Sequence, residues 1–114
     1  MSRSEAAIYD KVEALVRLGG DESLFSELTQ LFVTESSAYC RALEEALASA
    51  DPALLQREAH SVKSMLATFS YEEGRALAMQ LEYLAATGTL DGADRLTAQV
   101  VGAVKRLAAV FAKT

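Results

Sequence analysis

Apolar residues recur every three or four positions along almost the whole chain, and only short groups of Gly, Asp, Pro and Ser interrupt them. Such spacing places the apolar side chains on one face of each of several α-helices. Of the 114 residues, 51% are hydrophobic, and Ala, Leu and Glu, which favour helices, are abundant. We therefore expect an all-α protein: an antiparallel up-and-down four-helix bundle with a short extra N-terminal helix, formed as a single domain by residues 1–114.

The interruptions predict where five helices begin and end. The second helix is expected over 22–49 and the third over 52–69, where Pro52 occupies the first helical position. Gly19-Gly20 and Gly88 are suited to end the first and fourth helices. A capping box formed by residues 70–73 predicts the start of the fourth helix. The residues expected to cap the five helices are Ser4, Asp21, Asp51, Ser70 and Asp91.

The same periodicity predicts which residues face the core. For the first and second helices these are Ile8, Val12, Leu15, Leu24, Leu28, Leu31, Phe32, Tyr39, Leu43 and Leu47. For the third to fifth they are Leu55, Ala59, Val62, Leu66, Phe69, Leu77, Leu81, Leu84, Leu96, Val100, Val104, Leu107 and Phe111.

Charge and composition exclude several functions. The formal net charge of −5 argues against a nucleic-acid binder, which needs a basic surface. No apolar run is long enough to insert into a membrane, and the first residues do not resemble a secretory signal. The lone Cys40 and lone His60 do not suggest a metal site, and no glycine-rich phosphate loop is present. We expect a cytoplasmic protein without a metal or other cofactor.

His60, the only histidine, lies off the apolar face of its helix. One turn away are Gln56, Arg57, Lys63 and Ser64, so the ring should stand at the surface. Helical side chains lean toward the N-terminus, which brings Lys63 and Ser64 back over the ring. A neutral imidazole is a competent nucleophile near neutral pH, and a phosphoryl group on it needs positive charge nearby. This pattern is suited to the protein's part of a phosphoryl transfer, with His60 as the acceptor.

The segment from Ala59 to Ser70, AHSVKSMLATFS, resembles the signature of histidine phosphotransfer (HPt) domains, which runs Ala-His-x-Leu-Lys-Gly, then small residues, then an apolar residue and Gly. Leu18-Gly19-Gly20-Asp21 with Leu31-Phe32, Gln80-Leu81-Glu82 and Thr87-Gly88 extend the likeness over most of the chain.

The resemblance implies a phosphocarrier that is not an enzyme. His60 would accept the phosphoryl group, Lys63 would stabilise it, and Ser64 would be the small position beside the ring. The receiver partner would supply the aspartate, the metal and most of the catalytic machinery. The sequence departs from the family pattern at Ser64 and Ser70, where the family usually has Gly. The Ser64 hydroxyl can bond the ring or the phosphoryl oxygens, or it can crowd a docking loop, and Ser70 is expected to cap the next helix.

The expected partners are response-regulator receiver domains, with a hybrid sensor kinase as a further candidate. Gln56, Arg57 and Ala67 lie on the histidine face, and Phe32 and Val33 are candidates for an apolar docking surface beside it. A complete bundle within one chain predicts a monomer. The rival hypothesis is an HPt-like module that docks receivers or other helical partners without accepting phosphate. The sequence has no room for the ATP-binding domain that a histidine kinase requires.

Overall fold

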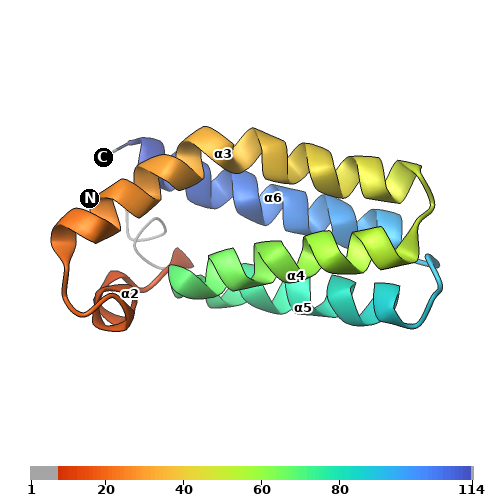
Figure 1. Cartoon of the computed structure of the whole chain (residues 1–114), viewed down its shortest axis with the longest axis horizontal. Helices are drawn as coiled ribbons and strands as arrows, with labels where there is room; N and C mark the ends of the chain where they lie inside the picture. The colour runs from red at the N-terminus through yellow and green to blue at the C-terminus, as the bar shows by residue number, and fades with distance from the viewer. Residues whose placement is uncertain (1–7, 114) are drawn as a thin grey trace.

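The computed structural model describes residues 8–113, and every regular element in that range is helical. The five labelled helices are α2 (Lys11–Arg17), α3 (Glu22–Ala48), α4 (Pro52–Thr68), α5 (Glu72–Ala86) and α6 (Ala93–Ala112). The long helices α3 to α6 lie side by side along the long axis of the molecule (Figure 1). The all-helical prediction is confirmed, while the predicted cap at Ser4 lies outside the described range.

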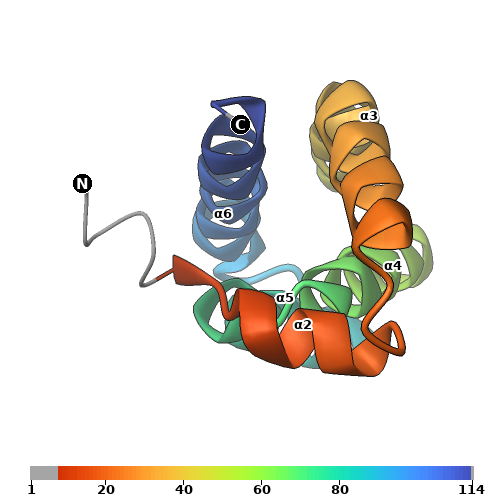
Figure 2. The same cartoon turned by 90° about the vertical axis from the view of Figure 1, so that its left-hand side faces the viewer.

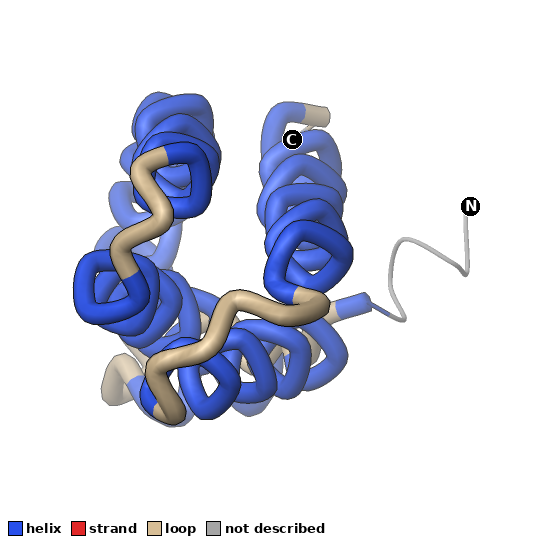
Figure 3. The backbone as a smooth tube through the Cα atoms, turned by 90° about the vertical axis from the view of Figure 1, so that its right-hand side faces the viewer, coloured by secondary structure: helices blue, strands red, loops and turns tan. Residues whose placement is uncertain are grey.

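Each long helix packs against two of the others: α4 contacts α3 and α5, and α6 contacts α3 and α5. Short loops at one end join α3 to α4 and α5 to α6 (Figure 3). At the opposite end, α2 lies across the ends of α4 and α5 (Figure 2). The Asp10 amide donates to the Ser70 carbonyl, and Arg17 Nε donates to Ser70 Oγ at 3.2 Å, so α2 is held by the α4–α5 turn.

Asp side chains cap three helices, two of them, α3 and α4, at the residues that the sequence predicts. Asp21 accepts from the Leu24 amide at 2.9 Å, and Asp51 accepts from the Leu54 amide at 3.1 Å. Asp10 caps α2 in the same way, so the described first helix begins later than expected. These bonds satisfy amides that have no partner within the helix.

Two predicted caps are wrong. The cap residue of α5 is Tyr71, and no side chain bonds the first amides, so the capping box does not form. Ser70 instead adopts a left-handed conformation with φ of 54° after the end of α4. This is the conformation for which glycine is suited, which accounts for the usual glycine of the family at this position. The last helix begins after Gly92 and has no side-chain cap, because the chain also turns through a left-handed residue there.

The core is built from the inner faces of all four long helices. All five core residues predicted for the third helix are buried, as are Val100, Val104, Leu107 and Phe111 of α6. An aromatic cluster fills the end of the core near α2, with Phe69 and Phe111 centroids 4.9 Å apart. Edge-on contacts of this kind add to the burial of each ring.

Three residues expected in the core are exposed instead. Val12 is 74% exposed, Leu31 is 54% exposed and Leu24 is 37% exposed. The buried residues of α3 are Phe25, Thr29, Phe32, Cys40, Leu43 and Ala46. The buried stripe of α3 is therefore rotated toward Phe25 and Thr29, because α3 packs against α6 as well as α4.

The close approach of α5 to α4 depends on Gly74. A Cβ atom at this position would lie 2.9 Å from Leu66 Cδ1 and 2.9 Å from the Tyr71 ring. Such contacts are too short for real atoms, so a larger residue here would force the Leu66 and Tyr71 side chains to shift. This packing brings the middle of α5 against the outer flank of α4, where His60 lies. None of the helices within residues 8–113 is long and apolar enough to cross a membrane.

Candidate functional site

His60 lies near the middle of α4 with its side chain 59% exposed, as the sequence predicts. Its Nδ1 atom is 2.7 Å from Oε2 of Glu82 on α5. An ionised carboxylate only accepts hydrogen bonds, so the hydrogen of this bond is on Nδ1. The neutral ring then has its lone pair on Nε2, the nitrogen at the other end of the imidazole.

Glu82 also contacts Lys63. The Lys63 ammonium lies 2.6 Å from Glu82 Oε1, and both side chains are largely buried, at 24% and 13% exposed. This contact holds the pKa of the Glu82 carboxyl below its ordinary value, and the hydrogen bond from His60 acts in the same direction, against partial burial. The carboxylate is therefore ionised at neutral pH and orders two side chains at once.

The predicted small residue beside the ring has a defined orientation. Ser64 is exposed, and its hydroxyl donates to the His60 backbone carbonyl at 3.1 Å. The Ser64 hydrogen therefore points to the backbone and not to the imidazole. Thr68 Oγ1 donates in turn to the Ser64 carbonyl. Such bonds to the preceding turn are a common arrangement for Ser and Thr inside helices.

A hollow of about 330 Å³ lies on the surface beside His60. Its lining residues are Ala53, Gln56, Arg57, His60 and Glu82. The structure thus brings Gln56 and Arg57, both predicted from the sequence, to the same hollow as the histidine. Ala67 is half-buried two turns further along α4 and does not line this hollow.

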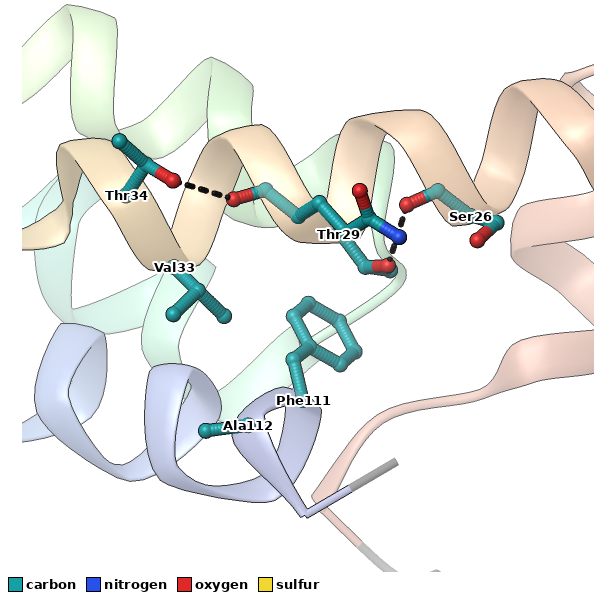
Figure 4. Close-up of a pocket in the computed structure, with 7 residues that line it drawn as sticks. Ser26, Thr29, Val33, Thr34, Phe111 and Ala112 are labelled. Carbon is teal, nitrogen blue, oxygen red and sulfur yellow. Dashed lines mark hydrogen bonds between the residues drawn. The ribbon is translucent and has the colours of Figure 1, made fainter.

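The two residues proposed on α3 lie elsewhere. Phe32 is 1% exposed and belongs to the core, so the expectation that it docks a partner is wrong. Val33 is half-buried and lines a separate pocket of about 550 Å³ with Phe111 and Ala112 of α6 (Figure 4). The positions of Phe32 and Val33 follow from the rotation of the buried stripe of α3, which turns the side of the helix that bears them toward α6.

Sequence reasoning assigned no role to Glu82. The residue is 22 positions from His60, and no local spacing links the two. Its position beside the buried Leu81 places it on the flank of the α5 apolar face, but that flank does not identify the facing helix. Only the packing of α4 against α5 pairs the two side chains.

Comparison with known proteins adds independent findings. The family model described as "Hpt domain" matches residues 27–110. The crystal structure of histidine-containing phosphotransfer protein B (HptB) from Pseudomonas aeruginosa PAO1 superposes with a TM-score of 0.84 at 24% sequence identity. That match covers 95% of this chain and 94% of the other. A comparison with curated protein sequences gave no significant match.

The family match covers more than half of the chain, and the match to HptB shows the same fold. Hpt domains are phosphocarriers that interact with response-regulator receiver domains, and they are not classical enzymes. The chain therefore belongs to the Hpt domain family and is a histidine phosphotransfer protein of phosphorelays.

Proposed function

We propose that His60 is the residue that carries the phosphoryl group, and that Nε2 is the accepting nitrogen. The Nε2 lone pair attacks the phosphorus of an aspartyl phosphate on an upstream receiver. The new N–P bond forms as the P–O bond breaks, and the aspartate leaves as a carboxylate. A downstream receiver's aspartate then attacks the phosphohistidine, and the imidazole nitrogen leaves with its electron pair. Phosphoryl transfer of this kind depends mainly on in-line positioning and charge neutralisation.

The contact between His60 Nδ1 and Glu82 Oε2 carries this proposal. It keeps the hydrogen on Nδ1 and leaves the lone pair of Nε2 available as the nucleophile. The positive charge that develops on the ring during attack is stabilised by the same carboxylate. The arrangement is the one a histidine needs to act repeatedly as a nucleophile at neutral pH.

The other residues of the site have supporting roles in the proposal. Lys63 neutralises the phosphoryl oxygens once the group is on His60, and Ser64 leaves room for the receiver. Gln56, Arg57 and Ala67 contact the receiver on the surface of α4. The receiver supplies the metal ion and most of the catalytic groups. The protein docks transiently, as a carrier must, and a hybrid sensor kinase is a further candidate donor.

The proposal includes the arrangement of the helices, the extent of the domain and the oligomeric state. We assign α3 to α6 to an antiparallel up-and-down four-helix bundle, with α2 as the short additional helix at the N-terminal end. The bundle is taken to be one domain over residues 1–114 and to act as a monomer. His60 then stands on an outer flank of the bundle, where the active pocket of a receiver can reach it.

The test is phosphotransfer from radiolabelled, phosphorylated receiver domains to the wild type and to His60→Gln. Glutamine retains a hydrogen-bonding side chain but has no nucleophilic nitrogen, so only the wild type should acquire label. The label should be lost in acid and retained in base, as expected of a phosphoramidate bond. No label from any receiver, with the folded variant and the wild type binding receivers equally well, would overturn the proposal and favour a docking module.

A further inference from the structure

Two cations lie near His60, Lys63 and Arg57, and they differ in how readily they can bind an incoming anion. Lys63 is paired with Glu82 at 2.6 Å in a site that is largely shielded from water. The two charges cancel, and releasing the ammonium would leave a partly buried carboxylate with one partner fewer. Lys63 is therefore poorly placed to attract a phosphoryl group that has not yet arrived.

Arg57 is the other cation at the hollow, and it is exposed. Among residues 8–113 no ion pair of Arg57 occurs. Within α4, the neighbours three and four positions away are Ala53, Leu54, His60 and Ser61, none of which is a carboxylate. The carboxylate that lines the hollow, Glu82, already contacts His60 and Lys63.

The net charge of the hollow therefore comes from Arg57. The charges of Glu82 and Lys63 offset each other, which leaves the Arg57 guanidinium as the unpaired cation of the hollow on a protein whose formal net charge is −5. A guanidinium also has a planar pair of donors that matches two oxygens of a phosphoryl group. It can form these bonds without first breaking an ion pair.

We propose that Arg57 recognises the aspartyl phosphate of the donor receiver before transfer, and that Lys63 acts only on the transferred group. This division of roles rests on the proposed phosphorylation of His60. It predicts that Arg57 determines how tightly the phosphorylated receiver binds, while Lys63 determines how fast the group moves.

The first experiment measures kcat and KM for phosphotransfer from a phosphorylated receiver with Arg57→Ala, Lys63→Ala and Arg95→Ala. Arg95 is an exposed arginine on α6 and controls for the change in net charge. Arg57→Ala should raise KM about three- to tenfold with little change in kcat, the size expected for one exposed charge-assisted contact. Lys63→Ala should mainly lower kcat. A KM for Arg57→Ala equal to that of Arg95→Ala, or a loss confined to kcat, would overturn the assignment.

A second measurement reads recognition without the transfer step. The dissociation constant is measured for a receiver domain with and without beryllium fluoride, which mimics the phosphoryl group on the aspartate. Arg57→Ala should weaken binding of the loaded receiver several-fold more than that of the unloaded one. Equal weakening of both would mean that Arg57 contacts the receiver surface and not the phosphoryl group, against the proposal. Labelling of the wild type but not of His60→Gln would still support the proposed function in that case.

Discussion

Nδ1 of His60 and Oε2 of Glu82 lie 2.7 Å apart, although the two residues are on different helices. The same carboxylate contacts Lys63 through its other oxygen at 2.6 Å. One side chain of α5 thus orients both residues of α4 to which we assign the chemistry. If His60 carries the phosphoryl group, as we propose, its reactivity should depend on how α5 packs against α4, and not on α4 alone.

Replacing Glu82 tests this dependence. Glu82→Ala removes the hydrogen-bond acceptor of Nδ1, so both ring tautomers become populated and the ring is free to rotate. We expect the phosphotransfer rate to fall about tenfold, because a hydrogen bond to a charged group contributes roughly 1.5–3 kcal/mol and only part of that is specific to the transition state. Single-turnover phosphotransfer from a labelled receiver measures the change.

Glu82→Gln is the matched control for that experiment. Its amide oxygen can still accept from Nδ1, but it has no charge to pair with Lys63. Its rate should therefore lie between those of the wild type and the alanine variant. If Glu82→Ala transfers at the wild-type rate, the carboxylate does not position the nucleophile.

The lowered pKa of Glu82 predicts how stability varies with pH. The Lys63 contact is the main cause of the lowering, so the ionised carboxylate stabilises the folded state. That contribution is complete above the unfolded-state pKa of about 4.3 and is lost as the pH falls through the lower pKa of the folded protein. From about pH 5 downward, the free energy of unfolding of the wild type should fall more steeply than that of Glu82→Gln.

Urea unfolding of both proteins at a series of pH values checks this. Glu72 also has a lowered pKa, caused mainly by its hydrogen bonds from Arg75. Its effect is the same in both proteins and cancels in the difference. A difference in unfolding free energy that stays constant from pH 6 to pH 3 would show that the Glu82 contact does not stabilise the fold.

The sequence predicts elements well where a local signal determines them. Asp21 and Asp51 mark the starts of α3 and α4 because each side chain bonds an amide three residues on. The α4 stripe is predicted in full because its apolar residues are flanked by polar ones. The phase of the α3 stripe is not, since apolar residues such as Leu24 and Leu31 surround that helix on more than one side. Periodicity cannot then decide which side is buried.

In the candidate site too, the residues on one helix could be predicted from the sequence, and the residue from a second helix could not. His60, Lys63, Arg57 and Gln56 share one helix, so helical geometry alone places them together. Glu82 reaches His60 only through the packing of α5 on α4. No spacing in the sequence indicates which residue of α5 lies opposite His60 of α4.

Ser70 offers a test of backbone strain against hydrogen bonding. Its left-handed φ of 54° is unfavourable for a residue with a β-carbon, but its hydroxyl accepts from Arg17 of α2. Ser70→Ala keeps the strain and loses the bond, so it should destabilise the protein by about 1 kcal/mol. Ser70→Gly loses the same bond but removes strain of about 1 kcal/mol, so its stability should be close to that of the wild type.

Urea unfolding at neutral pH gives the order of the Ser70 variants. Adding Arg17→Ala to Ser70→Ala should cost less than adding it to the wild type, because their shared bond is already gone. Equal stability of the alanine and glycine variants would show that the left-handed backbone is not strained in this turn.

Ala50 provides a cleaner case of the same strain, because its side chain is exposed and forms no bond that a substitution would remove. It follows Ser49, the C-cap residue of α3, and has a φ of 52°. In this turn the Ala50 amide donates to the Leu47 carbonyl and the Asp51 amide donates to the Ala46 carbonyl. Glycine is the residue most often found at this position of such a turn. Ala50→Gly should therefore raise the unfolding free energy by about 0.5–1 kcal/mol, after allowing for the extra freedom of glycine in the unfolded chain.

The matched control is Ala38→Gly, at an exposed position inside α3, which should lower the unfolding free energy by about 1 kcal/mol. Thermal unfolding of the two variants should thus shift in opposite directions, while phosphotransfer is unchanged in Ala50→Gly because the turn lies away from His60. A lower melting temperature for both variants would contradict the prediction.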